Sequence, residues 1–299
     1  PHALHNTEFK KLQRKMMLSG DRPKECDYCW RAEDAAKGDT PIYSDRITKS
    51  SEPWARPYLE KCAEMPWDAN AYPTYLEVSF DTLCNFKCMY CSPAFSTTWK
   101  QEIQEYGPYT MTDMTLHSLD YLKQSGQFPI PVSADNPYIN AFWKWWPDLY
   151  NDLDTFRITG GEPLLSKDTW GVLDYIINEK NPNTELKLAI NSNLGIPDNL
   201  VDKFIEKIRR IEDEGRVKEI VIFTSVDTWG EHAEYIRNGL EFNRFWDNVN
   251  RILREVPKIT ITFMVTYNML SVFSFDKFIK GVYELKKEYA GDDRYWLSP

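Results

Sequence analysis

Hydrophobic and polar positions recur with two different periods along the chain. Short runs of β-branched and aromatic residues predict strands, and longer segments with apolar residues three or four positions apart predict helices. The predicted strands are residues 75–80, 155–159, 186–191, 219–225 and 259–265. The helices predicted after them are residues 96–106, 167–178, 197–211, 231–237, 242–254 and 275–289. This alternation predicts an α/β fold with a parallel sheet and right-handed crossovers.

The segments outside this alternation have other patterns. Residues 9–18 predict a short helix, and residues 49–72, rich in proline, tryptophan and charge, predict a linker with one helical turn. Residues 113–124 predict a further helix. The aromatic run 141–147 predicts an amphipathic helix packed on the core, with a substrate-facing wall as the alternative.

Polar residues follow each predicted strand at its carboxyl end, where parallel α/β folds place their active sites. After the first strand comes a cysteine-rich loop. The later groups are Gly160-Gly161-Glu162-Pro163, Asn191-Ser192-Asn193, Ser225-Val226-Asp227 and Thr266-Tyr267-Asn268. At Asn193 and Asp227 a helix N-cap or a turn is an equally good explanation. Five such groups in succession nevertheless favour one shared ligand site.

The loop after the first strand carries three cysteines, Cys84, Cys88 and Cys91, as Cys-x3-Cys-x2-Cys. Cysteine thiolates are the usual ligands of iron–sulfur clusters, and four are normally needed to close a four-iron cluster. Three would hold three irons and leave the fourth open to another ligand, as a reacting metal centre requires.

A zinc site is the alternative use of the cysteines. It would combine Cys88 and Cys91 with the Cys-x2-Cys pair Cys26 and Cys29, although 58 residues separate the pairs and Cys84 would be left over. Cys62, the sixth cysteine, is expected to be a small buried apolar residue.

Composition narrows the classes of function. The chain has a net charge of −9 with scattered basic residues, which does not favour a nucleic-acid interface. We find neither a run of about twenty apolar residues, as a membrane span needs, nor a signal-peptide pattern. The six cysteines in a chain of this length favour metal or cluster binding in a reducing cytoplasm over disulfides. Because the first residue is Pro1, we expect the natural N-terminus to lie upstream.

The cysteine triplet, with Tyr90 before its last cysteine, and the string Arg157-Ile-Thr-Gly-Gly-Glu-Pro163 together resemble the radical S-adenosylmethionine (SAM) enzymes. The resemblance extends over about residues 75–289 and implies a six-stranded partial barrel of the TIM type, whose sixth strand would begin near Tyr295. It implies that Cys84, Cys88 and Cys91 bind a four-iron, four-sulfur (4Fe-4S) cluster whose open iron is chelated by SAM.

Further roles are implied only by this resemblance. Gly160, Gly161 and Glu162 would receive the SAM amine, and Tyr90 would lie near the adenine. Asn193 resembles the Asn of the Thr-Asn-Gly sequence that ends a strand in this family. The chain departs from that sequence because Leu194 stands between Asn193 and Gly195. Ser225 and Asp227 resemble a Ser-x-Asp motif that contacts SAM, and Asn268 would lie near the adenosine. Arg237 would pair with the SAM carboxylate, and the alternative for it is an ion pair on the surface.

The N-terminal segment adds a second resemblance. Gly20, Pro23, Cys26, Cys29, Glu33, Gly38, Ser44 and Arg46 match, in order, a cysteine-bearing segment of radical SAM proteins with a twitch or SPASM-like domain. Further cysteines that precede this segment in that family are not in this sequence. A second iron–sulfur cluster at Cys26 and Cys29 is therefore a prediction that needs ligands from elsewhere.

The sequence as a whole predicts an incomplete twitch/SPASM-like segment with a linker over residues 1–70 and a radical SAM partial barrel over residues 71–299. The expected reaction is reductive cleavage of SAM to a 5′-deoxyadenosyl radical that abstracts hydrogen from a substrate. The expected partners are SAM, a one-electron reductant such as flavodoxin or ferredoxin, and a peptide or protein side chain, with no nucleic acid or membrane. A small-molecule or nucleotide-derived substrate, and a zinc-binding structural protein, are the alternatives.

Overall fold

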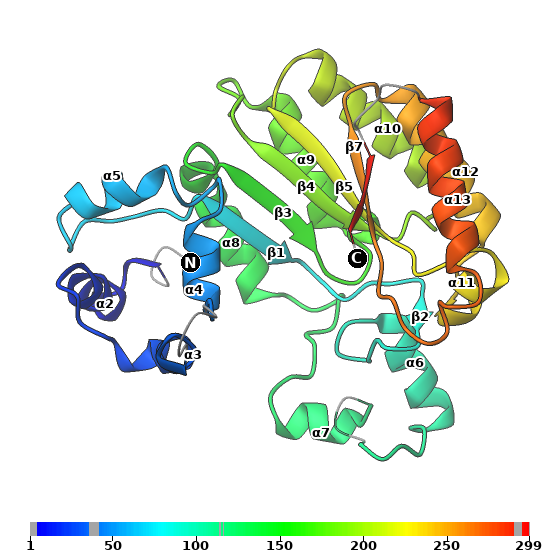
Figure 1. The fold of residues 1–299 in the computed structure, drawn as a ribbon, viewed down its shortest axis with the longest axis horizontal. Coiled ribbons are helices and arrows are strands. Elements are labelled where there is room, and N and C mark those ends of the chain that lie inside the picture. Colours follow the sequence, from blue (N-terminus) through cyan, green and yellow to red (C-terminus); the bar gives the residue numbers. More distant parts are fainter. Residues whose placement is uncertain (1–4, 36–41, 114, 116, 290–294, 299) are drawn as a thin grey trace. The chain divides into compact units, whose positions relative to one another are not determined.

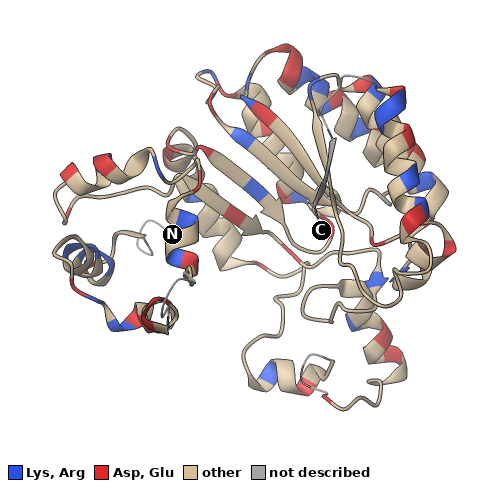
Figure 2. Ribbon diagram, in the orientation of Figure 1, with Lys and Arg blue, Asp and Glu red and all other residues tan. Residues whose placement is uncertain are grey.

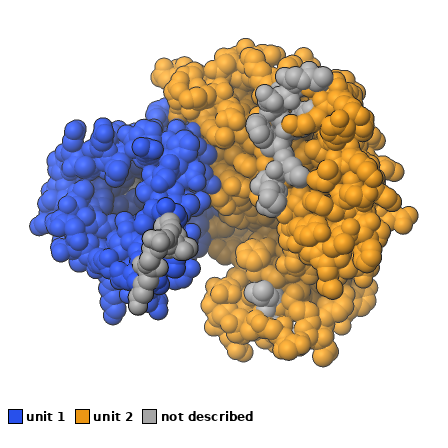
Figure 3. Space-filling view, in the orientation of Figure 1, with its two compact units in different colours: residues 1–76, 137–155 blue, residues 77–136, 156–299 orange. Residues whose placement is uncertain are grey.

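The structure is a computed structural model that describes residues 5–35, 42–113, 115, 117–289 and 295–298. The chain divides into two compact units, coloured separately in Figure 3. Unit 1 comprises residues 1–76 and 137–155, and unit 2 comprises residues 77–136 and 156–299. The predicted division into residues 1–70 and 71–299 concerns function and stays a prediction.

A parallel sheet forms the centre of the fold (Figure 1). Within the described residues it has six strands in the order β1-β3-β4-β5-β7-β8. Their bounds are β1 (Tyr75–Ser79), β3 (Thr155–Thr159), β4 (Lys187–Ser192), β5 (Glu219–Ser225), β7 (Thr260–Met264) and β8 (Tyr295–Ser298). The α/β class, the five predicted strands and the sixth at Tyr295 are confirmed, whereas closure into a partial barrel stays a prediction.

The register of the sheet sets which side chains share a face. Asn191 of β4 is the Cα partner of Phe223 of β5, which is in turn the partner of Thr262 of β7. Successive residues of a strand point to opposite faces. The residues that flank Asn191 and Phe223, such as Ile190 and Ile222, are therefore on the other face, where they are fully buried.

The helices of unit 2 surround the strands of the sheet in Figure 1. They are α6 (Thr97–Tyr106), α7 (Leu119–Gln124), α9 (Lys167–Asn178), α10 (Asp198–Asp213), α11 (Glu231–Ile236), α12 (Phe242–Glu255) and α13 (Phe275–Glu288). In α10 the apolar positions Val201, Ile205 and Ile208 recur on one stripe and are buried, as an amphipathic helix requires. Charges of both signs lie on the outer surface of α10, α12 and α13 (Figure 2).

The helix predicted over residues 113–124 is shorter in the structure, and this prediction was partly wrong. The Asp113 carboxylate accepts hydrogen bonds from the backbone N–H and the hydroxyl of Thr115, at 2.9 and 2.6 Å, so this stretch forms a local turn. The helix α7 begins only after Ser118, whose hydroxyl caps it by accepting from the Tyr121 N–H at 3.2 Å.

Unit 1 is largely helical. Its elements are α2 (Glu8–Leu18), the 3-10 turn η1 (Lys24–Cys26), α3 (Asp27–Ala35), α4 (Asp45–Ser50), α5 (Tyr58–Glu64) and α8 (Pro137–Tyr150). The predicted linker thus contains the helix α5. In α8 the rings of Phe142, Trp145 and Trp146 are buried, which confirms the core role of the aromatic run. Among the described helices, none has the length and apolar character needed to cross a membrane.

Candidate active site

The cysteine loop is held in place by the start of α6. The Cys84 N–H donates to the Thr97 hydroxyl at 3.1 Å, and the Trp99 indole donates to the Cys88 carbonyl at 2.9 Å. Ser96 caps α6 through its hydroxyl oxygen and donates to the Phe86 carbonyl at 2.8 Å. Because these bonds join the loop to a regular helix, the cysteines are presented from a rigid base.

The three cysteines line one cavity of about 300 Å³ in unit 2. Most residues with a predicted SAM contact line the same cavity, namely Tyr90, Gly160, Gly161, Asn193, Ser225 and Arg237. Asn191 and Ser192 of the predicted strand-end group also line it, together with Phe86 and Phe95, to which sequence reasoning had given no role. Its size falls in the range of small-molecule sites.

The chemistry of the three thiols fits a cluster. All three are free, and burial raises the pKa of Cys84 to about 12 and also raises the pKa values of Cys88 and Cys91. Buried thiols of this kind ionise when a metal cation offsets the cost of burying the thiolate.

A single-ion site is not supported by the same geometry. In the part of the chain that the structure describes, no three Cys, His, Asp or Glu side chains come together as one metal ion would require. In a cluster each cysteine binds a different iron, so three sulfurs do not need to meet at one point. The zinc alternative, which combines cysteines of unit 1 and unit 2, stays an alternative.

Gly160 and Gly161 bring the loop after β3 against the cysteine loop. The φ of Gly160 is 124°, and a Cβ there would lie 2.8 Å from the Asp81 carbonyl oxygen. A Cβ on Gly161 would overlap the Leu83 carbonyl. The next residue, Glu162, donates its N–H to that same Leu83 carbonyl at 2.5 Å. The glycines are thus required for close backbone packing, whatever ligand they contact.

Glu162 is buried beneath this contact and does not line the cavity. Its carboxylate accepts hydrogen bonds from the Asn193 N–H at 2.6 Å, the Ser192 hydroxyl at 2.8 Å and the Leu164 N–H at 3.1 Å. Burial raises the pKa of Glu162 to about 7, and the three donors lower it less than burial raises it. Its predicted role at the SAM amine stays a prediction.

Asn193 binds both its own turn and the cysteine loop. Its amide oxygen accepts from the Gly195 N–H at 2.8 Å, which confirms the turn interpretation. Its amide nitrogen donates to the Asn85 side chain at 2.9 Å, and Asn85 donates back to the Gly195 carbonyl at 2.8 Å. Leu194, the departure from the family pattern, has a positive φ of 49°.

Asp227, Arg237 and Tyr90 form one hydrogen-bonded network, in which Asp227 and Arg237 are buried. The fully buried Asp227 carboxylate accepts two bonds from Arg237, at 2.8 and 3.0 Å, and one from the Tyr90 hydroxyl at 2.7 Å. It also accepts from the Thr266 N–H at 3.0 Å, so it is neither an N-cap nor a simple turn. The network joins β5 to the cysteine loop.

Arg237 also reaches the cysteines. The two-residue strands β2 (Lys87–Cys88) and β6 (Arg237–Asn238) pair antiparallel, with Cys88 opposite Arg237, and the Arg237 Nη1 lies 3.7 Å from the Cys88 Sγ. Its side chain is 8% exposed, so the surface ion pair considered from the sequence is wrong.

Asn268, like Glu162 and Asp227, is a predicted contact that does not line the cavity. Its side chain accepts from the Leu270 N–H and donates to the Thr266 carbonyl, both at 2.9 Å. These bonds shape its own loop, so its place near the adenosine stays a prediction.

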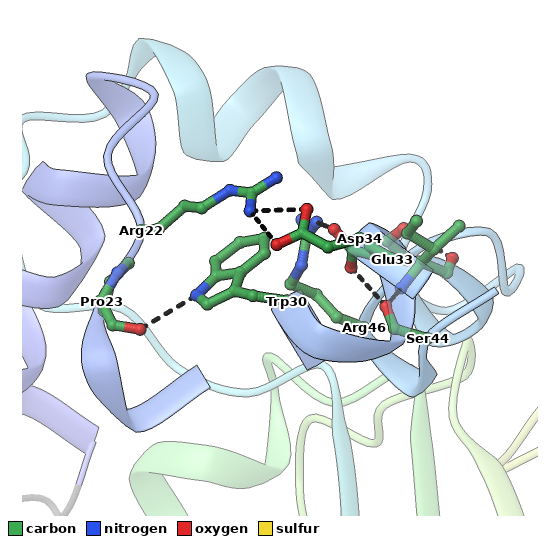
Figure 4. A network of polar contacts seen from close by, with 9 residues as sticks. Arg22, Pro23, Trp30, Glu33, Asp34, Ser44 and Arg46 are labelled. Carbon is green, nitrogen blue, oxygen red and sulfur yellow. Dashed lines mark hydrogen bonds and ion pairs between the residues drawn. The ribbon is translucent and has the colours of Figure 1, made fainter. Parts of the chain in front are cut away.

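The N-terminal motif forms a polar network in unit 1 (Figure 4). Glu33 accepts from the Ser44 hydroxyl at 2.5 Å and from Arg46 at 2.6 Å. Arg46 lies over the Trp30 ring at 4.2 Å, and the Trp30 indole donates to the Pro23 carbonyl at 3.0 Å. The matching residues Pro23, Glu33, Ser44 and Arg46 thus share one structural role, while Gly38 lies outside the described residues.

Cys26 and Cys29 lie at the start of this segment as free, partly buried thiols. Neither has the further ligands that a metal ion needs among the described residues. A second cluster here stays a prediction. Cys62 is exposed in α5, so the expectation of a buried apolar residue was wrong.

Comparison with known proteins gives partial matches. No model of a known protein family matches the chain. It is 28% identical over 104 residues to the GTP 3′,8-cyclase of Alkaliphilus metalliredigens (strain QYMF), which covers 35% of this chain and 23% of that protein. It is 24% identical over 192 residues to the molybdenum cofactor biosynthesis protein moc-5 of Caenorhabditis elegans. This match covers 64% of this chain and 25% of that protein. The chain thus spans about a quarter of the length of these curated relatives.

Solved structures give weaker likenesses. Streptococcus suis SuiB bound to S-adenosylmethionine matches with a TM-score of 0.47 and 15% identity, over 98% of this chain and 52% of that chain. Native anSMEcpe with bound AdoMet matches with a TM-score of 0.41 and 17% identity, over 75% of this chain and 50% of that chain. Both of these structures contain bound S-adenosylmethionine.

Proposed function

We propose that this protein is a radical SAM enzyme whose Cys84, Cys88 and Cys91 bind a 4Fe-4S cluster. The observation that carries the proposal is the single cavity in which these three thiols meet the two glycines after β3 and the polar ends of β4 and β5. When bound, the cluster supplies the electron that cleaves SAM to methionine and a 5′-deoxyadenosyl radical, which takes a hydrogen atom from the substrate.

The residues of the chain orient SAM and exclude water from it. Gly160 and Gly161 would present their backbone to the methionine part, and Glu162 would accept a hydrogen bond from the amine. Ser225 and Asn193 offer polar contacts from neighbouring strands, and Asn268 lies on the next loop. Tyr90 lines the cavity for the adenine, and Asp227 fixes its hydroxyl and Arg237.

We propose a second role for Arg237 beside the one expected at the SAM carboxylate. Two of its nitrogens are engaged by Asp227, and its Nη1 faces the Cys88 sulfur. A SAM carboxylate would therefore share this guanidinium with Asp227. We assign Arg237 to stabilising the negative charge of the Cys88 thiolate and of any carboxylate beside it.

The substrate class stays open between two proposals. A peptide or protein side chain is the first, by analogy with twitch and SPASM relatives. A nucleotide-derived molecule is the second, because one relative is a GTP 3′,8-cyclase. In either case flavodoxin or ferredoxin would supply the electron, and the reducing cytoplasm would be the compartment.

The test is anaerobic reconstitution with iron and sulfide, followed by dithionite and SAM, with 5′-deoxyadenosine measured by mass spectrometry. Wild type should form the product, Cys88→Ala should form none, and Cys62→Ala should match wild type because Cys62 is exposed and outside the cavity. A colourless protein that binds zinc in place of iron would refute the proposal.

A further inference from the structure

A second cavity of unit 2, of about 490 Å³, lies on the other side of the cysteine loop. Successive side chains of the loop alternate between the two cavities. Cys88 and Tyr90 line the cysteine cavity, whereas Lys87 and Met89 line the second one. Such alternation is expected of an extended segment, and residues 87 and 88 form the strand β2. Among the described residues, none lines both cavities, so the loop separates them.

Trp99 of α6 connects the second cavity with the cysteine loop. Its ring lines the cavity, and its indole N–H donates to the Cys88 carbonyl at 2.9 Å. The rings of Tyr109 and His117, which also line the cavity, meet the Trp99 ring edge to face, with centroids 5.8 and 5.3 Å away. Edge-to-face contacts between aromatic rings are favourable. This wall is therefore formed without a ligand.

The rest of the lining is rich in exposed apolar side chains. Met89, Met111 and Tyr235 line the cavity, and all three are exposed. Methionine sulfur makes favourable contacts with aromatic rings, and its flexible side chain adapts to the shape of a ligand. A ring bound between these side chains and Trp99 would remove apolar surface from water on both sides. The lining therefore fits an aromatic ligand.

The charges in the second cavity are already balanced. The Glu102 carboxylate forms an ion pair with Lys87 and accepts from the Tyr109 hydroxyl at 2.6 Å. Burial lowers the pKa of His117 from its ordinary value of 6.5, so its imidazole is neutral at pH 7. A charged ligand would have no partner of opposite charge here, which favours an uncharged one.

His117 has a polar atom without a partner. Its side chain is 8% exposed, and its buried Nδ1 has no hydrogen bond among the described residues. Buried polar atoms of this kind are rare in folded proteins, because leaving them unpaired is costly. In a neutral imidazole one ring nitrogen accepts and the other donates. A hydroxyl group can do both, so it can pair with Nδ1 whichever nitrogen carries the proton.

We infer that the second cavity binds a small, uncharged aromatic molecule that carries a hydroxyl group. Its ring would pack against Trp99, Met89 and Met111, and its hydroxyl would pair with His117. The site is distinct from the cysteine cavity and needs neither cluster nor SAM. Because Met89 belongs to the cysteine loop and Trp99 is bonded to it, a bound ligand would contact that loop from the side opposite the cysteines.

The first experiment measures binding of two matched compounds to the full chain without a cluster. The compounds are 4-ethylphenol and 4-ethyltoluene, in which a methyl group replaces the hydroxyl, and their dissociation constants are measured by ligand-observed NMR titration. 4-Ethylphenol should bind about threefold to tenfold more tightly, as one hydrogen bond to a previously unpaired atom allows. Equal affinities, or no saturable binding of either compound, would overturn the inference.

Two histidine variants test the partner of the hydroxyl. His117→Phe keeps an aromatic ring beside Trp99 and removes Nδ1, so it should bind the two compounds equally. His232→Phe is the matched control, since His232 stacks on Phe273 and does not line the cavity. It should keep the preference of wild type for 4-ethylphenol. The same preference in His117→Phe would overturn the inference.

A measurement on wild type covers the case in which His117→Phe does not fold. The chain is treated with hydrogen peroxide, and oxidation of Met111 and Met17 is followed by peptide mapping. These two side chains are similarly exposed, at 40% and 39%, but only Met111 lines the cavity. 4-Ethylphenol at twice its dissociation constant should slow oxidation of Met111 about threefold relative to Met17. Equal rates with and without the compound would overturn the inference.

SAM provides the last control, with protein reconstituted with iron and sulfide. SAM should not displace 4-ethylphenol, because the two cavities have no lining residue in common among the described residues. Displacement by SAM would place the compound in the cysteine cavity and overturn the inference. A protein that binds 4-ethylphenol as expected but forms no 5′-deoxyadenosine would refute the proposed function and leave the second site standing.

Discussion

Titration of Glu162 should make this protein less stable as the pH rises. Its carboxyl is buried, and burial raises its pKa from the ordinary value of 4.5 to about 7. The folded state therefore binds the proton more tightly than the unfolded state does. The resulting stabilisation is fully present below pH 4.5 and is lost as the pH rises through about 7.

The size of the effect follows from the two pKa values. Each pH unit between them corresponds to about 1.4 kcal/mol, so the full effect is about 3 kcal/mol. Between pH 5 and pH 8 the contribution of Glu162 to the free energy of unfolding should fall by about 2–3 kcal/mol. The three donors to the carboxylate favour its ionised form, and the pKa of about 7 already includes their effect.

The assay is urea unfolding of metal-free protein at pH 5, 6, 7 and 8, for wild type and Glu162→Gln. The variant removes the titrating group and leaves one of the three donors facing an amide NH₂, so it should be less stable than wild type at pH 5. The difference between the two proteins cancels the titration of all other groups and should fall by about 2–3 kcal/mol towards pH 8. A constant difference would refute the reasoning, since the donors would then offset the burial.

Three further predictions follow from the same contacts. Gly161→Ala should destabilise the protein by about 1–3 kcal/mol in urea, because the new methyl group meets a backbone carbonyl that cannot move aside. Tyr90→Phe should cost about 1–2 kcal/mol by losing its 2.7 Å bond to a buried carboxylate, whereas Tyr121→Phe, at a similarly exposed position but with no hydrogen bond to its hydroxyl among the described residues, should cost nothing measurable. If Cys26 and Cys29 bind a second cluster, replacing both with alanine should lower the iron content from about eight to about four atoms per chain; unchanged iron would make them structural.

The strands and most of the helices could be predicted because their patterns are local. Each strand is an apolar run with clear ends, and a helix such as α12 repeats its buried positions every three or four residues. The error at residues 113–124 also has a local cause, which is the hydrogen bonding of polar side chains. Asp113 and Ser118 favour turn and cap geometries that a hydrophobic pattern does not reveal.

The partners of the polar residues could not be predicted, since they depend on contacts distant in the sequence. The motif indicated that Arg237 binds a ligand, but not that Asp227 and Cys88 occupy its nitrogens. In the sequence, Arg157 was identified only as the first residue of the motif that ends at Pro163. Its contacts with Asn191 and Phe223 come from strands that are distant in the sequence.

The ends of three strands hold the cysteine loop from different sides, and this gives a physical reason for their convergence. After β3, the Glu162 N–H donates to Leu83; after β4, Asn193 donates to Asn85; after β5, Asp227 accepts from Tyr90. A site that reduces a bound cofactor needs its metal ligands fixed by residues around them, because their orientation sets the properties of the metal.

Polar residues at these strand ends are thus needed to orient the cysteines even before any ligand is bound. The same side chains can contact SAM only with the groups that this framework leaves unused. For Arg237 that is chiefly the nitrogen facing Cys88, which implies that substitutions at the strand ends should disturb cluster binding together with SAM binding.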